Sequence, residues 1–100
     1  MTLADILTLR VDFRDPEAAA RITPEQANAY LAAHGWTGPS VVHEYAIWLD
    51  PSDGLRQALV PLQTHWRDYG ASMVTLLNDL ARHEDRSPLA VYAEMIMVRE

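Results

Sequence analysis

Histidine is the side chain in this sequence best suited to metal binding or to acid–base catalysis at neutral pH. The chain holds four histidines, which are His34, His43, His65 and His83. A local metal site requires short spacings such as H-x-H, H-x₃-H or H-E-x-x-H, and none of them occurs here. The sequence therefore predicts no metal site. Because cysteine is absent, it also predicts no thiol chemistry and no disulfide.

Carboxylates and hydroxyls are the other candidates for catalysis, and local structure explains the most conspicuous of them. Asp53 and Ser52 belong to a predicted turn, Glu84 and Asp85 to a predicted connector, and Ser87 to a predicted helix cap. No spacing brings two carboxylates together as a general acid–base pair, and no nucleophile motif or phosphate-binding glycine loop is present. We therefore expect no catalytic residue, no cofactor and no enzyme activity. The alternative is a small enzyme without a recognisable motif.

The composition is that of a single small globular domain spanning residues 1–100, with a hydrophobic fraction of 49%. Its net charge of −6 argues against a generic nucleic-acid-binding surface, which is usually basic. No apolar run is long enough for a membrane span. The first residues lack the basic region of a secretory signal. These features predict a cytoplasmic protein that contacts neither nucleic acid nor membrane.

Three helices can be predicted from their caps and periodicity. Thr23, Pro24 and Gln26 form a capping-box pattern before a helix over residues 24–34, and Gly35 suits its left-handed end. A second helix should begin between Thr64 and Asp68 and end near His83. Its apolar stripe at steps of three and four is Trp66, Tyr69, Met73, Leu76, Leu77 and Leu80. A last helix should follow Ser87, with Val91, Tyr92, Met95 and Ile96 on its inner face.

Residues 41–50 (VVHEYAIWLD) and 55–62 (LRQALVPL) are rich in β-branched, aromatic and aliphatic residues, and they predict a β-hairpin. The segment Pro-Ser-Asp-Gly between them suits a four-residue loop in which Gly54 takes a positive φ. This loop pairs Asp50 with Leu55 and Trp48 with Gln57.

In this register the two faces of the hairpin differ. One face holds Tyr45, Ile47, Leu49, Ala58, Val60 and Leu62. We expect the helices to pack against this face, with Leu77 of the long helix buried there. The other face holds Glu44, Ala46, Trp48, Leu55, Gln57 and Leu59. Helices on one side of a small sheet leave the other side in solvent, so Trp48, Leu55 and Leu59, with Glu44 beside them, are the predicted partner-binding residues. Two alternatives remain open: the N-terminal segment could cover Trp48, or a one-residue slip could exchange the faces.

Residues 7–13 (LTLRVDF) alternate in hydrophobicity as a strand does, but residues 2–9 also fit a short capped helix. The fold class predicted is therefore α+β: a small antiparallel sheet of two or three strands centred on the hairpin, with about three helices on one face. The order is an uncertain first element followed by α-β-β-α-α.

The segment LLNDLARHEDRSPLAVYAEMI resembles the two-helix part of ribbon-helix-helix regulators, in which a strand precedes two helices joined by an acidic-glycine-arginine-serine turn. The resemblance covers about 45 residues and implies a dimeric DNA-binding regulator with QALVPLQ as its ribbon. Two positions depart from the pattern. The ribbon offers glutamines where basic side chains usually contact DNA, and Asp85 stands where the turn has glycine.

The whole chain resembles small uncharacterised proteins of actinobacteria and their phages in the segments VDFRDP, ITPEQANAYLAAHGW, VPL and HEDRS. All eight basic residues are arginine, which is typical of GC-rich genomes. This resemblance implies no activity. The function we expect is a non-enzymatic protein-interaction module that binds a host or phage protein or a second copy of itself.

Overall fold

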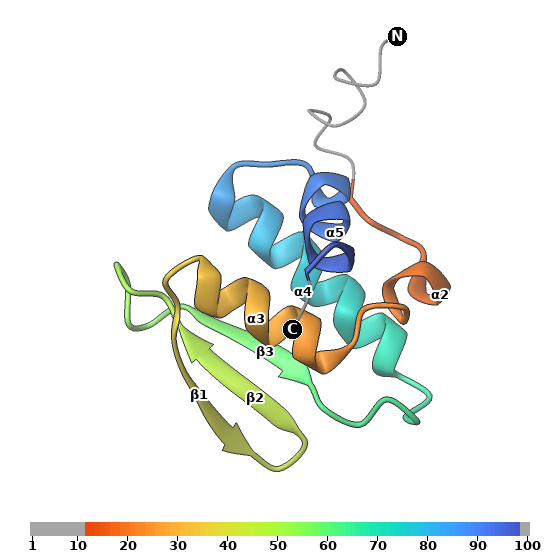
Figure 1. The fold of residues 1–100 in the computed structure, drawn as a ribbon, viewed down its shortest axis with the longest axis horizontal. Helices are drawn as coiled ribbons and strands as arrows, with labels where there is room; N and C mark the ends of the chain where they lie inside the picture. Colours follow the sequence, from red (N-terminus) through yellow and green to blue (C-terminus); the bar gives the residue numbers. More distant parts are fainter. Residues whose placement is uncertain (1–11, 99–100) are drawn as a thin grey trace, which may run out of the picture.

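The computed structural model describes residues 12–98 and has the predicted α+β class (Figure 1). Its elements in chain order are α2 (Pro16–Ala19), α3 (Pro24–Ala33), β1 (Thr37–Val42), β2 (Tyr45–Leu49), β3 (Gln57–Pro61), α4 (Tyr69–Glu84) and α5 (Pro88–Ile96). The strands form one antiparallel sheet in the order β1-β2-β3. Residues 1–11 lie outside the described part, and the choice between strand and helix for them remains a prediction.

Helices α3 and α5 begin at the capping residues predicted from the sequence. The Thr23 hydroxyl accepts a hydrogen bond from the Gln26 N–H at 3.0 Å, and the Gln26 side chain accepts one from the Thr23 N–H at 3.0 Å. Gly35 takes the positive φ of 84° predicted for the end of α3. Ser87 caps α5 by accepting a hydrogen bond from the Leu89 N–H at 3.1 Å. These cap hydrogen bonds satisfy N–H groups that a helix start leaves unpaired.

Helix α4 begins at Tyr69, one residue beyond the predicted range for its start, and ends at Glu84, next to the predicted end at His83. Its C-cap is Asp85, whose φ of 57° and ψ of 45° are left-handed, a conformation usually supplied by glycine and tolerated by aspartate. The Arg86 N–H then donates to the Ala81 carbonyl at 2.9 Å, which closes the helix. At the position of the glycine in the ribbon-helix-helix turn, Asp85 therefore takes the left-handed conformation that glycine adopts most readily.

The sequence prediction missed strand β1. Val41 and Val42, predicted as the start of a single strand over 41–50, are the end of β1, and the chain turns at His43 and Glu44 before β2 begins. His43 has a φ of 54°, which is uncommon for a residue other than glycine. No turn signal was recognised there because neither His nor Glu is a typical turn residue.

The register predicted for the hairpin is wrong by one residue. Leu49 pairs with Gln57 and Trp48 with Ala58, and the Asp50 N–H bonds to the Arg56 carbonyl at 3.0 Å. The connecting segment is therefore longer than the predicted four residues. Since side chains alternate along a strand, a shift of one exchanges the faces. Trp48 lies inside the molecule, where it is only 4% exposed.

The loop has this length because the Asp50 side chain organises it. Its Oδ1 accepts hydrogen bonds from the N–H and from the hydroxyl of Ser52, both at 2.7 Å. This is an Asx-type turn, in which a side chain replaces a backbone partner. Gly54 was predicted to have a positive φ, but only Gly35 and Gly38 do among the described glycines. The prediction for Gly54 is wrong because the turn is formed by Asp50.

The core lies between the helices and the inner face of the sheet, which carries Ala46, Trp48, Ala58 and Val60. The Trp48 Nε1–H donates to the Asn28 Oδ1 of α3 at 2.9 Å. Leu77 is fully buried as expected, but the prediction that α4 packs on the Tyr45–Ile47–Leu49 face is wrong. The α4 residues buried in this core are Tyr69, Met73, Leu76, Leu77, Leu80 and Ala81.

Trp66 departs from the predicted helical stripe. It precedes α4 and is half-buried, and its ring lies 6.0 Å from that of Tyr45 in an edge-on arrangement. Trp66 is therefore a partial cover for one end of the outer sheet face.

The short helix α2 was not predicted, and it packs against the start of α4 at a glycine. A Cβ on Gly70 would lie 2.4 Å from the Pro16 carbonyl oxygen and 3.0 Å from its carbon. Both contacts are with backbone, so neither neighbour can turn aside as a flexible side chain would. Gly70 therefore permits the close approach of α2 to α4.

We expect Trp48→Ala to lower the free energy of unfolding by about 3–5 kcal/mol, the usual cost of removing a buried aromatic side chain. Leu55→Ala, on the same hairpin but 94% exposed, should change it by no more than about 0.5 kcal/mol. Denaturant unfolding of both variants measures the difference. Equal effects would contradict the observed register.

Gly70→Ala should destabilise the domain by about 1–3 kcal/mol through overpacking, although alanine normally favours a helix by up to about 1 kcal/mol. Gly54→Ala is the matched control, since nothing lies within 4 Å of a Cβ there. Thermal unfolding of the two variants tests this contact. A Gly70→Ala protein as stable as the wild type would show that α2 does not pack closely on α4.

Candidate functional site

The structure separates the four residues predicted to bind a partner. Trp48 is buried in the core of its own chain, so it cannot offer a partner surface and that prediction is wrong. Leu55 and Leu59 are 94% and 45% exposed, and Glu44 is exposed. Glu44 and Leu55 lie near opposite ends of the hairpin, because the Glu44 carbonyl accepts a hydrogen bond from the Leu62 N–H. The structure therefore does not bring the predicted residues into one patch.

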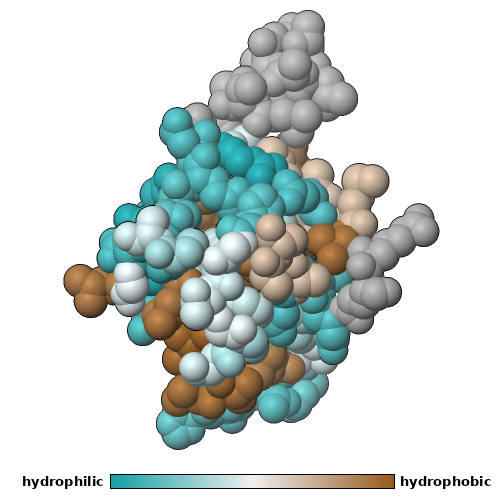
Figure 2. Space-filling view, turned by 60° about the vertical axis from the view of Figure 1, so that its left-hand side comes forward, coloured by the Kyte–Doolittle hydropathy of each residue, from teal (hydrophilic) through white to brown (hydrophobic). Residues whose placement is uncertain are grey.

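The exposed apolar surface lies instead on the outer face of the sheet, defined by Val42, Tyr45, Ile47, Leu49 and Leu59. Val42 is 47% exposed, and the three β2 side chains are half-buried. Hydrophobic colouring gathers at the lower end of the molecule, where β1 turns into β2 (Figure 2). In Figure 1, β1 and β2 extend away from the helices, which explains why every residue of β1 is exposed.

A groove follows the line where β3 meets α4, and we call it the seam groove. Its first hollow has a volume of about 290 Å³ and is lined by Tyr45, Gln57, Leu59, Ser72, Thr75, Leu76 and Asp79. Its second hollow has a volume of about 390 Å³ and is lined by Trp36, Arg56, Gln57, Ala58, Asp79, Leu80, Arg82 and His83. Gln57 and Asp79 line both hollows, which makes them adjoining parts of one groove.

The two hollows of the seam groove differ in chemistry. Tyr45, Leu59 and Leu76 give the first hollow an apolar floor. The second hollow contains Arg56 and Arg82, although the net charge of the whole chain is −6. Asp79 lies 4.0 Å from Arg82, and both side chains are largely exposed, so this is a weak surface pair.

His83 joins the second hollow to the hairpin loop. Its Nε2 lies 2.7 Å from the Asp50 Oδ2, and the Asp50 side chain is 1% exposed. No hydrogen bond from residues 12–98 reaches Oδ2, and the His83 contact is an ion pair only when the imidazole is protonated. The Ser52 hydroxyl and N–H hold the pKa of Asp50 below its usual value against the opposing effect of burial, and His83 adds to the lowering.

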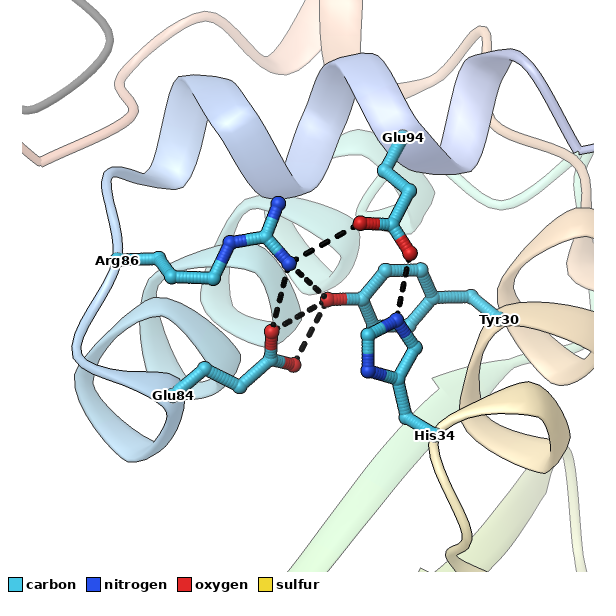
Figure 3. Close-up of polar contacts among 5 residues, drawn as sticks. All are labelled: Tyr30, His34, Glu84, Arg86 and Glu94. Atoms are coloured by element: carbon cyan, nitrogen blue, oxygen red, sulfur yellow. Dashed lines mark hydrogen bonds and ion pairs between the residues drawn. The ribbon is translucent and has the colours of Figure 1, made fainter.

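A second polar cluster joins three helices on another part of the molecule (Figure 3). The Tyr30 hydroxyl of α3 donates to Glu84 at the end of α4, 2.6 Å from Oε1. Arg86 Nη1 donates to Glu84 at 3.0 Å and to Glu94 of α5 at 3.1 Å. The His34 Nε2 lies 2.5 Å from Glu94, and its ring stacks on that of Tyr30 at 4.1 Å.

This cluster is suited to holding the three helices together. Burial and the hydrogen bond to Glu84 raise the pKa of Tyr30 well above its usual range, so the phenol stays protonated at neutral pH. Each charged group in the cluster already has a partner of opposite charge. In residues 12–98, no three His, Asp or Glu side chains are grouped as a metal site would require.

Sequence reasoning missed both the seam groove and this cluster. The groove combines residues of β3 with residues of α4, and the cluster combines α3 with α4 and α5. These partners are far apart in the sequence, and only the hairpin register and the helix packing bring them together.

None of the helices among residues 12–98 meets the length and hydrophobicity that a membrane span requires.

Comparisons with family models, with curated proteins and with solved structures found no match for this chain.

Acid should destabilise the domain partly through Asp50. Because the pKa of Asp50 is lower in the folded chain than its ordinary value of 3.8, its ionised form contributes stability above about pH 4, and this contribution is lost as the pH falls through the folded pKa. Asp50→Asn should therefore flatten the fall of stability below pH 4, measured by denaturant unfolding across pH. Asp68→Asn, at an exposed side chain that forms no cap hydrogen bond at the start of α4, should keep the wild-type slope. The same slope in both variants would contradict the role given to Asp50.

Proposed function

We propose that this chain is a non-enzymatic protein-interaction module of a GC-rich bacterium or its phage, acting in the cytoplasm. The observation that supports this proposal most directly is the apolar outer face of the sheet. Val42 and Leu59 expose almost half of their surfaces there, and Tyr45, Ile47 and Leu49 are half-buried. Contiguous apolar patches of this kind are typical of protein-binding surfaces.

The contrast between the two faces of the sheet strengthens the proposal. On the inner face, Ala46, Trp48, Ala58 and Val60 are all buried beneath helices. The outer face carries equally apolar residues, and within residues 12–98 these are only half-buried or exposed. Exposed aliphatic side chains next to aromatic ones gain stability when a partner removes them from water, at roughly 25 cal/mol per Å² of apolar surface.

The two alternative functions gain less support. In a ribbon-helix-helix regulator the strand forms a two-stranded ribbon with that of a second protomer, whereas β3 belongs to a three-stranded sheet of its own chain. Its outward side chains there, Gln57 and Leu59, are not the basic residues expected in a DNA groove. An enzyme needs a reactive group placed in a cleft, and the polar groups of the Tyr30–Glu84 cluster are already paired with one another.

The test is a Val42→Glu/Leu59→Glu double variant, which places charge on the outer face without altering the core. Leu89→Glu is the matched control, since Leu89 is an exposed leucine in the first turn of α5, where an acidic residue is favourable. We expect one partner protein, or a second copy seen by sedimentation, to bind the wild type and the control but not the double variant. Circular dichroism checks that both variants fold. Equal binding by the folded double variant would refute the proposed surface.

A further inference from the structure

We infer that the seam groove binds an extended segment of the partner protein as an added strand on β3, with apolar side chains in the first hollow and acidic side chains in the second. This inference rests on the proposed function and names the chemistry of the partner. Three features of the groove support it: a free strand edge, an apolar floor and a local excess of basic residues.

The first feature is the hydrogen-bonding direction of β3. The Arg56 carbonyl and the Leu62 N–H both bond towards β2 and its adjoining turns. Because backbone groups alternate in direction along an antiparallel strand, Gln57 and Leu59 direct their N–H and C=O groups to the opposite edge. No hydrogen bond within residues 12–98 is found for these edge groups. They are available to a strand that enters the groove.

The second feature is the lining of the first hollow. The side chains of Leu59 and Gln57 project from β3 beside the free edge, and Leu76 of α4 contributes to the opposite wall. Ser72 and Thr75 form a polar rim along the helix. A strand on the edge of β3 would direct alternate side chains to the face that carries Leu59, so apolar residues at those positions would lie over this floor.

The third feature is the charge of the second hollow, further along the same strand. Arg56 at the start of β3 and Arg82 on α4 both line it, and Asp79 is the single carboxylate among its lining residues. Arg82 is 73% exposed and only weakly paired with Asp79 at 4.0 Å, so its guanidinium can turn to a ligand. Guanidinium groups bind carboxylates in a bidentate geometry, which favours acidic side chains on the segment.

The immobilised chain can be tested against three pools of short peptides. All pools carry apolar residues at every second position and differ only in the residues between them and in their ends. The first pool has Asp and Glu at the other positions, and the second has Lys and Arg, both with blocked ends. The third pool has Ser and Thr and a free terminal carboxylate. We expect the chain to retain the acidic pool preferentially. Preferential retention of the basic pool, equal retention of all three, or no retention would overturn the inference. Preferential retention of the third pool would assign the groove to a chain terminus and overturn it as well.

An Arg56→Glu/Arg82→Glu variant should bind the best acidic peptide about ten- to a hundredfold more weakly, because two favourable charge contacts become repulsive. Arg14→Glu/Arg67→Glu is the matched control: it changes the net charge equally, and both residues are exposed and outside the groove. Equal weakening in the two variants would show a nonspecific charge effect and refute the site.

Hydrogen exchange distinguishes strand addition from other modes of binding. The amides of Gln57 and Leu59 should exchange quickly in the free protein and become protected in the peptide complex. Binding without protection of these two amides would refute the added strand. If the outer-face variant abolishes capture of the partner while the wild type retains no acidic peptide, this inference fails and the proposed function stands. If the Val42→Glu/Leu59→Glu variant still binds its partner, the proposed function is refuted, and the inference that rests on it is refuted as well.

Discussion

The buried carboxylate of Asp50 is the contact on which the arrangement of this domain depends. By accepting both hydrogen bonds from Ser52, it gives the hairpin loop the length that pairs Asp50 with Arg56. That pairing places every side chain of β2, and Trp48 above all, on its observed face. The same carboxylate contacts His83 near the end of α4. One side chain therefore sets the register of the sheet and connects the sheet to the longest helix.

Helix α3 forms polar contacts with both the sheet and the other helices. On the side of the sheet, Asn28 accepts the indole N–H of Trp48. On the side of the other helices, Tyr30 contacts Glu84 and Arg86. Both polar contacts flank a core of fully buried aliphatic residues. Polar groups that are satisfied in this way favour one packing of the helices over alternatives in which they would be left without partners.

The sequence predicts those features of the fold that depend on neighbouring residues. Thr23 with Gln26, and Ser87 with its proline, define helix starts within a few residues of chain, and the stripe that includes Leu77 defines α4. The class, the hairpin and the last two helices follow from such signals. The register does not, because it depends on how Asp50 bonds within the loop, and a one-residue difference reverses both faces. The outer face and the seam groove depend on that register. The predicted position of Trp48 was therefore wrong, and the groove could not be predicted.

The two edges of the sheet also limit how copies of this chain can polymerise. At the edge formed by β1, Pro39 has no N–H to offer, and the pairing with β2 is irregular between Thr37 and Ser40, which are features that discourage growth of a sheet from one molecule to the next. At the other edge, α4 lies along β3, so a strand entering there would have a helix and not a further strand beside it. Stacking through the outer face of the sheet would pair two molecules and then leave no such face free. The partly exposed apolar face is thus compatible with small closed assemblies, while the irregular β1 edge and the α4 helix beside β3 limit edge-to-edge growth beyond one added strand.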